Sequence, residues 1–130
     1  MKKKFFIIIF FIFGLAQKSF AYSSDPKQFI QEIVDEAKKV LIESNTKEFK
    51  TQKLSEMATK TVDIKGVAYY TLGNYRKKLN DEQLKEYLEL FEKYFLKTFA
   101  SRLTDYSDPK IDVLSAEVKN PKYTIVKSVL

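Results

Sequence analysis

The chain has 130 residues, which is enough for one small domain. It contains no His and no Cys, which excludes histidine acid–base catalysis, cysteine nucleophiles, disulfide bonds and the usual zinc sites, and we expect no cofactor. The formal net charge is +6, but four of the 23 Lys and Arg residues and none of the 17 acids lie in the first 21 positions. The rest of the chain has 19 basic residues against 17 acids, or +2, so its charge does not indicate nucleic-acid binding.

The first 21 residues have the pattern of a secretory signal peptide. Residues 2–4 are all Lys, residues 5–13 are apolar without interruption, and Ser19 and Ala21 fit the small-residue pattern before a cleavage site. The apolar run is short for a membrane-spanning helix. We therefore expect export, cleavage after about Ala21 and one domain over residues 22–130. An uncleaved N-terminal anchor is the alternative.

Two helices are predicted at the start of the exported domain. Asp25 is suited to cap the first helix, and Pro26 is suited to its first position. Apolar residues then recur at helical spacing, which predicts a helix to about Glu43. A polar break at residues 44–46 separates it from a weaker helix expected over residues 47–59.

Residues 64–75 are apolar or aromatic on every side of a helix, which predicts a helix that is buried or lines a cavity. Asp63 precedes this segment, and we expect it to cap the helix rather than to act as a catalytic carboxylate. Gly66 and Gly73 each lower the helix propensity by about 1 kcal/mol relative to Ala. Their expected use is a close approach to another element.

The longest predicted helix runs from about Asn80 to Asp105, and Gln83 completes a capping box with Asn80. Its apolar residues form a stripe at helical spacing: Leu84, Tyr87, Leu88, Phe91, Phe95 and Phe99. The pattern alone favours a core face, and the wall of an apolar ligand cavity is the alternative. Arg102 lies on the side of this stripe. It either extends its charge into water or meets an anionic headgroup at a cavity mouth.

Residues 110–118 and 122–130 are rich in β-branched side chains, and Asn120-Pro121 between them indicates a turn. This pattern predicts an antiparallel pair of strands and, with the helices, an α+β domain. A two-stranded hairpin is marginal alone. Because the second strand runs to Leu130, we expect a sheet that is incomplete at the C-terminus, as in a truncated version of a longer domain.

Motifs of common enzymes are missing from the sequence. It has no Gly-rich phosphate loop and no Gly-x-Ser-x-Gly turn, and no convincing pair of carboxylates. Asp105 and Asp108 flank the end of the long helix, where a solvated loop is the favoured interpretation. The sequence therefore predicts a protein that is not an enzyme, with a small exported enzyme that uses Asp or Tyr as an alternative.

Three stretches resemble the MlaC family, which is also known for toluene tolerance and auxiliary ABC transport. They are residues 63–75 (Asp-Ile-Lys-Gly-Val-Ala-Tyr-Tyr-Thr-Leu-Gly-Asn-Tyr), the pair Glu82-Gln83, and residues 98–106 (Thr-Phe-Ala-Ser-Arg-Leu-Thr-Asp-Tyr). The order of the predicted elements is also similar. Arg76 departs from the family, which often has an aromatic residue there. The family's further strands, one of which bears Trp, and its C-terminal helix are not found in this sequence.

The resemblance implies an α+β fold in which N-terminal helices and a mixed or antiparallel sheet enclose an apolar cavity for phospholipid acyl chains. It also implies a periplasmic shuttle that maintains outer-membrane lipid asymmetry. The implied partners are phospholipid as cargo, an outer-membrane lipoprotein–porin complex, and an inner-membrane ABC transporter with an MCE-domain subunit, without nucleic acid.

With this resemblance, the cavity wall becomes the favoured interpretation of the aromatic stripe. The expected lining residues are Val67, Tyr70, Leu72, Tyr75, Leu88, Phe91, Phe95 and Phe99. Arg102 is the candidate for headgroup contact. The alternative function is a periplasmic helical interaction module with a solid core and no lipid cavity.

Overall fold

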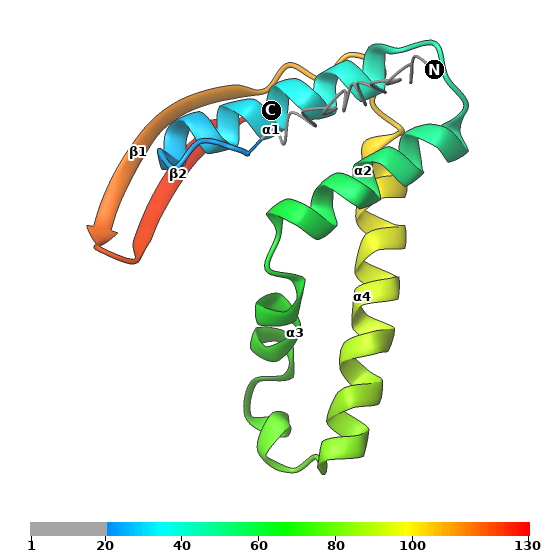
Figure 1. Ribbon diagram of the computed structural model, residues 1–130, viewed down its shortest axis with the longest axis vertical. Helices are drawn as coiled ribbons and strands as arrows, with labels where there is room; N and C mark the ends of the chain where they lie inside the picture. The colour runs from blue at the N-terminus through cyan, green and yellow to red at the C-terminus, as the bar shows by residue number, and fades with distance from the viewer. Residues whose placement is uncertain (1–20) are drawn as a thin grey trace, which may run out of the picture.

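The computed structural model describes residues 21–130, so the predicted signal peptide lies almost wholly outside the described residues. The elements follow one another as α1 (Pro26–Ile42), α2 (Lys47–Thr61), α3 (Ile64–Leu72), the 3-10 helix η1 (Gly73–Lys77), α4 (Asp81–Leu103), β1 (Asp112–Asn120) and β2 (Tyr123–Val129). Helix α1 lies beside the β-hairpin at one end, while α3 and the first half of α4 extend away from it (Figure 1). Within residues 21–130, none of the helices has the length and apolarity that a membrane crossing requires.

Helices α1 and α2 begin where the caps predict. The Asp25 carboxylate accepts a hydrogen bond from the Gln28 amide at 2.8 Å, and Pro26 occupies the first position of α1. The Thr46 hydroxyl accepts from the Phe49 amide at 3.2 Å and starts α2. Both predicted helices are confirmed, and α2 ends at Thr61, two residues later than expected.

The short lead into α1 is held by Tyr22. Its ring packs edge-on against Phe29, with the centroids 5.6 Å apart, and its hydroxyl donates to the Glu36 carboxylate. Burial, together with the hydrogen bond to Glu36 and the nearby negative charges, raises the pKa of Tyr22 to about 12. The neutral phenol is thus the form that the fold stabilises.

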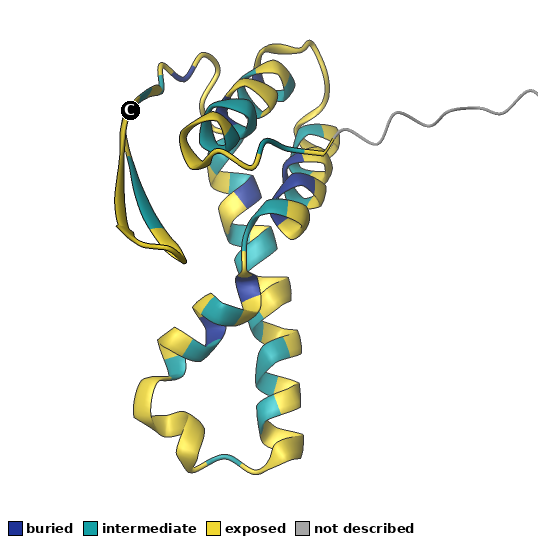
Figure 2. Cartoon of the chain, turned by 60° about the vertical axis from the view of Figure 1, so that its left-hand side comes forward, coloured by how far each residue is buried: buried dark blue, intermediate teal, exposed yellow. Residues whose placement is uncertain are grey.

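Helix α3 is capped by Asp63, whose side chain accepts from the Gly66 amide at 2.9 Å, so the capping prediction is confirmed. The segment was predicted to be buried or to line a cavity, and burial of the whole segment was wrong. Only Ile64 and Ala68 of this helix are buried, whereas Tyr70 is 89% exposed. The reason is that α3 packs on α4 along one side and on η1 at its end, while most of its other surface is exposed (Figure 2).

The two glycines of this segment serve the ends of α3, not the predicted approach to another element. A Cβ on Gly66 would stand 2.3 Å from the Asp63 carboxylate, so the glycine leaves room for the cap of its own helix. Gly73 has a φ of 52° and a ψ of −127°, which end α3 and turn the chain into η1. Its backbone conformation is one that other residues rarely adopt.

Helix α4 begins with the predicted capping box. The Asn80 side chain accepts from the Gln83 amide at 2.8 Å, and the Gln83 side chain accepts from the Asn80 amide at 3.1 Å. The helix ends at Leu103, two residues short of the predicted end. It packs on α3 along its first half and on α2 along its second half.

A small apolar core joins α1, α2 and the second half of α4. Its buried residues are Leu41, Leu54, Met57 and Ala100, with Ile33, Ala37, Val40 and Leu103 packed against them. Leu54 and Ala100 are completely inaccessible to solvent. In Figure 2 the buried residues gather mainly at this junction, and the arm formed by α3, η1 and the start of α4 is mostly exposed.

Strands β1 and β2 form the predicted antiparallel hairpin. The turn between them is supported by the Asn120 side chain, which accepts from the Lys122 amide at 2.9 Å. Helix α1 contacts both strands, and its Lys38 ammonium donates to the Ile111 carbonyl at 3.1 Å. The α+β class is confirmed, with an antiparallel sheet. In the described part of the chain this sheet has two strands and does not close, and the expected enclosed apolar cavity is not seen.

Candidate functional site

A groove of about 570 Å³ lies between the α2–α3 corner and the first half of α4. Its size falls in the range of about 300–1,000 Å³ that is usual for small-molecule sites. Eleven residues line it: Thr59, Val62, Asp63, Ile64, Lys65, Asp81, Leu84, Lys85, Leu88, Glu89 and Glu92. We call it the α3–α4 groove.

The α3–α4 groove exists because α2 and α3 meet at a sharp corner. Val62 closes α2 with an extended backbone, and Asp63 opens α3 at the next position, so the two helices cannot run on as one. The corner turns Ile64 and the side of α3 toward α4. Leu84 and Leu88, one helical turn apart on α4, face them across the groove.

The floor of the groove is apolar, and its rim is charged. The floor is formed by four apolar side chains, each of them buried or half-buried: Val62, Ile64, Leu84 and Leu88. Lys65 comes to the rim from α3 and Lys85 from α4, among four carboxylates. An apolar slot can take an acyl chain. At its rim the two ammonium groups are the only lining groups that could contact the phosphate of a headgroup, because the four carboxylates repel it.

The aromatic residues of α4 stack along the helix beside this groove. Ring centroids are 5.8 Å apart for Tyr87 and Phe91, 6.2 Å for Phe91 and Phe95, and 5.5 Å for Phe95 and Phe99. The Tyr87 hydroxyl donates to the Ala68 carbonyl at 3.3 Å and so ties the start of the stack to α3. The other three rings are half-buried or partly exposed, so the stack is an apolar surface and not a sealed core.

A second groove of about 310 Å³ lies between α1, the end of α4 and the hairpin. Leu41, Leu103 and Ile111 are among its apolar lining residues, and Lys38 is its only basic one. It is the smaller of the two and has less charge at its mouth.

The residues predicted to line a lipid cavity do not come together in one place. Leu88 lines the α3–α4 groove, whereas the other seven line neither groove. Leu72, Phe91 and Phe95 are half-buried. The remaining four are exposed to different degrees: Val67, Tyr70, Tyr75 and Phe99. Whether these eight residues touch lipid stays a prediction.

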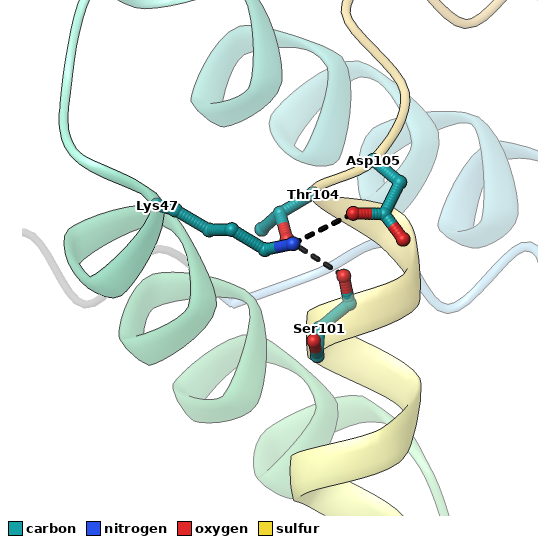
Figure 3. A network of polar contacts seen from close by, with 4 residues as sticks. All are labelled: Lys47, Ser101, Thr104 and Asp105. Carbon is teal, nitrogen blue, oxygen red and sulfur yellow. Dashed lines mark hydrogen bonds and ion pairs between the residues drawn. The ribbon is translucent and has the colours of Figure 1, made fainter.

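Arg102 is exposed near the end of α4 and lines neither groove. Two of the three acids considered as catalytic groups, Asp63 and Asp105, have structural partners, and Asp108 is exposed. Asp63 caps α3. Asp105 accepts from the Lys47 ammonium at 2.7 Å, and this ion pair joins the start of α2 to the end of α4 (Figure 3). Beside it, the Thr104 hydroxyl donates to the Ser101 carbonyl at 2.7 Å, within the last turn of α4.

Sequence reasoning missed the groove residues Val62, Lys65 and Lys85 altogether. Leu84 belonged to the predicted stripe, and Ile64 to the segment expected to be buried. The boundary between α2 and α3 at Asp63 could have predicted the groove. One helix ends there and the next begins at once, so the chain must change direction at this point.

A family model described as MlaC protein matches residues 22–130 of the chain. A search of curated proteins and a search of solved structures each returned no match.

Proposed function

The chain belongs to the MlaC family, and we propose that it is a periplasmic shuttle that binds phospholipid and carries it between the two membranes. The match over residues 22–130 is the observation that carries this proposal, because membership of the family supports a periplasmic role in phospholipid binding and transport. The proposed partners are an outer-membrane lipoprotein–porin complex and an inner-membrane ABC transporter with an MCE-domain subunit. Cleavage of a signal peptide after about Ala21 would place the protein in the periplasm.

The α3–α4 groove is the proposed site for an acyl chain. Its floor of Val62, Ile64, Leu84 and Leu88 offers an apolar surface, on which each buried methylene contributes roughly 0.8 kcal/mol. Lys65 and Lys85 are the proposed headgroup contacts, because an ammonium group attracts a phosphate oxygen. The aromatic stack of α4 would extend the apolar surface along the lipid.

This role requires no chemistry on the cargo. The MlaC family is a family of lipid-binding transport proteins and not of enzymes. In keeping with this, Asp63 and Asp105 are engaged in a helix cap and an ion pair. We propose that the protein acts by binding and release alone and uses no cofactor.

Paired substitutions on α4 test the site. Leu84→Asp with Leu88→Asp places two carboxylates in the groove floor. If the acyl chain loses its apolar contact at four methylenes, binding weakens by about 3 kcal/mol, which is more than a hundredfold in the affinity for phospholipid. Leu90→Asp is the matched control, because Leu90 lies on the same helix but is 57% exposed. The measurement is the amount of phospholipid that co-purifies with each variant, extracted with solvent and identified by mass spectrometry, with circular dichroism as the check on folding.

Phe91→Asp and Phe95→Asp form the second arm of this test. If lipid survives the groove pair but is lost from these variants, the aromatic stack is the wall and the groove is not. If lipid persists in every variant, neither surface holds it. Arg102→Gln, compared with Lys65→Gln and Lys85→Gln, separates the earlier headgroup candidate from the groove lysines.

A second function is favoured by one observation, the absence of an enclosed cavity in residues 21–130. With its packed core of Leu41, Leu54, Met57 and Ala100, the protein could serve as a helical interaction module that carries no lipid. A folded wild-type protein that never carries phospholipid would favour this module over the shuttle.

A further inference from the structure

A basic and aromatic tip stands at the end of the molecule that is remote from the hairpin (Figure 1). It consists of Tyr70, Tyr75, Arg76, Lys77 and Lys78, and all five are exposed. Tyr70 is 89% and Tyr75 69% exposed, so most of the surface of both side chains meets solvent. The positive φ of Gly73 turns the chain here, so that η1 projects from the end of α3.

The tip concentrates positive charge. Residues 64–80 contain four basic residues and no acid. Within residues 21–130, the three basic side chains of the tip form no ion pair, and the Lys78 ammonium lies over the Tyr75 ring at 5.1 Å from its centroid. Carboxylates resume at Asp81 and Glu82, in the first turn of α4, where the helix dipole already attracts them.

The shape of the tip indicates the class of its partner. Neither groove is lined by a residue between positions 66 and 80, so neither of them extends onto the tip, and a partner would meet its exposed side chains. Exposed Tyr side chains beside clustered Lys and Arg are the combination that favours the headgroup layer of a membrane. The phenol rings lie at the interface, and the cations attract anionic lipids.

We propose that this tip docks the protein on the surface of an anionic phospholipid bilayer. Docking goes beyond the proposed shuttle function, because it concerns the headgroup surface of a bilayer and not a lipid held in the groove. The tip and the α3–α4 groove belong to the same arm, and Asp81 of the groove lies three positions after Lys78. Docking therefore brings the groove close to the bilayer.

Vesicle flotation tests the proposal. Wild-type protein is mixed at low salt with vesicles of phosphatidylglycerol and phosphatidylcholine in equal parts, and in parallel with vesicles of phosphatidylcholine alone. The test variant carries Arg76→Gln, Lys77→Gln and Lys78→Gln. The matched control carries Lys110→Gln, Lys122→Gln and Lys127→Gln, which remove the same charge from exposed positions near the hairpin.

The wild type is expected to float with the anionic vesicles only, and to do so less as salt is raised. Because each basic residue near an anionic surface strengthens binding about fivefold, the test variant should bind about a hundredfold more weakly, and the control should change less than about fivefold. Binding that persists at high salt should be removed by Tyr70→Ser with Tyr75→Ser.

Two results would overturn docking. One is a wild-type protein that does not float with anionic vesicles. This result would overturn docking even if the tip bound a soluble acidic protein in a separate experiment. The other is an equal loss in the test and control variants, which would reveal a response to net charge alone. The phospholipid that co-purifies with each variant is measured on the same samples, so a failure of docking and a failure of lipid carriage are told apart.

Discussion

Two glycines and one carboxylate, all within eleven positions, decide how α3 starts and stops. Asp63 holds the first turn, Gly66 leaves space for that carboxylate, and Gly73 supplies the positive φ that ends the helix. At this scale the sequence predicted the cap correctly, because capping depends on a side chain and an amide three residues away. The use of the glycines was predicted wrongly, since a backbone angle and a local clash leave no trace in the pattern of apolar residues.

Gly73→Ala should lower the free energy of unfolding by about 1–3 kcal/mol, because Ala would have to adopt a backbone conformation that strains it. No neighbouring atom stands within 4 Å of the added Cβ, so the effect would come from the backbone alone. Urea denaturation followed by circular dichroism measures it. Asn74→Ala, at the next exposed position, is the control and should stay within about 0.5 kcal/mol of the wild type. Equal stability of the two variants would contradict this reading of Gly73.

At the scale of elements, where each helix lies was easier to predict than what covers it. The boundaries of α1, α3 and α4 follow from Asp25, Asp63 and Asn80, which act within one turn. Burial depends on segments distant in the sequence. The stretch around Tyr70 looks buried by composition, yet α3 packs mainly on α4 and η1, and Val67 and Tyr70 stay exposed. The proposed membrane docking uses these exposed side chains of α3 and η1.

Leu54→Ala should destabilise the fold by about 2–5 kcal/mol, since Leu54 is fully inaccessible where α2 packs on α4. The matched variant is Leu90→Ala, which removes the same atoms from a side chain that is 57% exposed and should cost less than about 1 kcal/mol. Thermal unfolding of the two proteins measures the difference. If Leu90→Ala proved the more damaging of the pair, the core would lie on the other side of α4.

At the scale of the whole molecule, the sequence predicted the α+β class, the antiparallel hairpin and the family, and the fold and the family match agree with them. The place of the site could not be predicted in the same way. Of the eight lining residues predicted from the sequence, only Leu88 faces the α3–α4 groove, because the groove is created by the corner at Val62 and Asp63 and not by the periodicity of α4. Helical spacing tells which side chains share a face, but the angle between two helices decides what that face meets.

The most direct test of the shuttle proposal is native mass spectrometry of the wild-type protein, purified from a bacterial periplasm. A lipid carrier should appear with added masses that match phospholipids and that disappear after extraction with organic solvent, and the extract should name the headgroups. A protein that keeps a helical circular dichroism spectrum but shows only the mass of the bare chain would contradict phospholipid carriage and favour the interaction module.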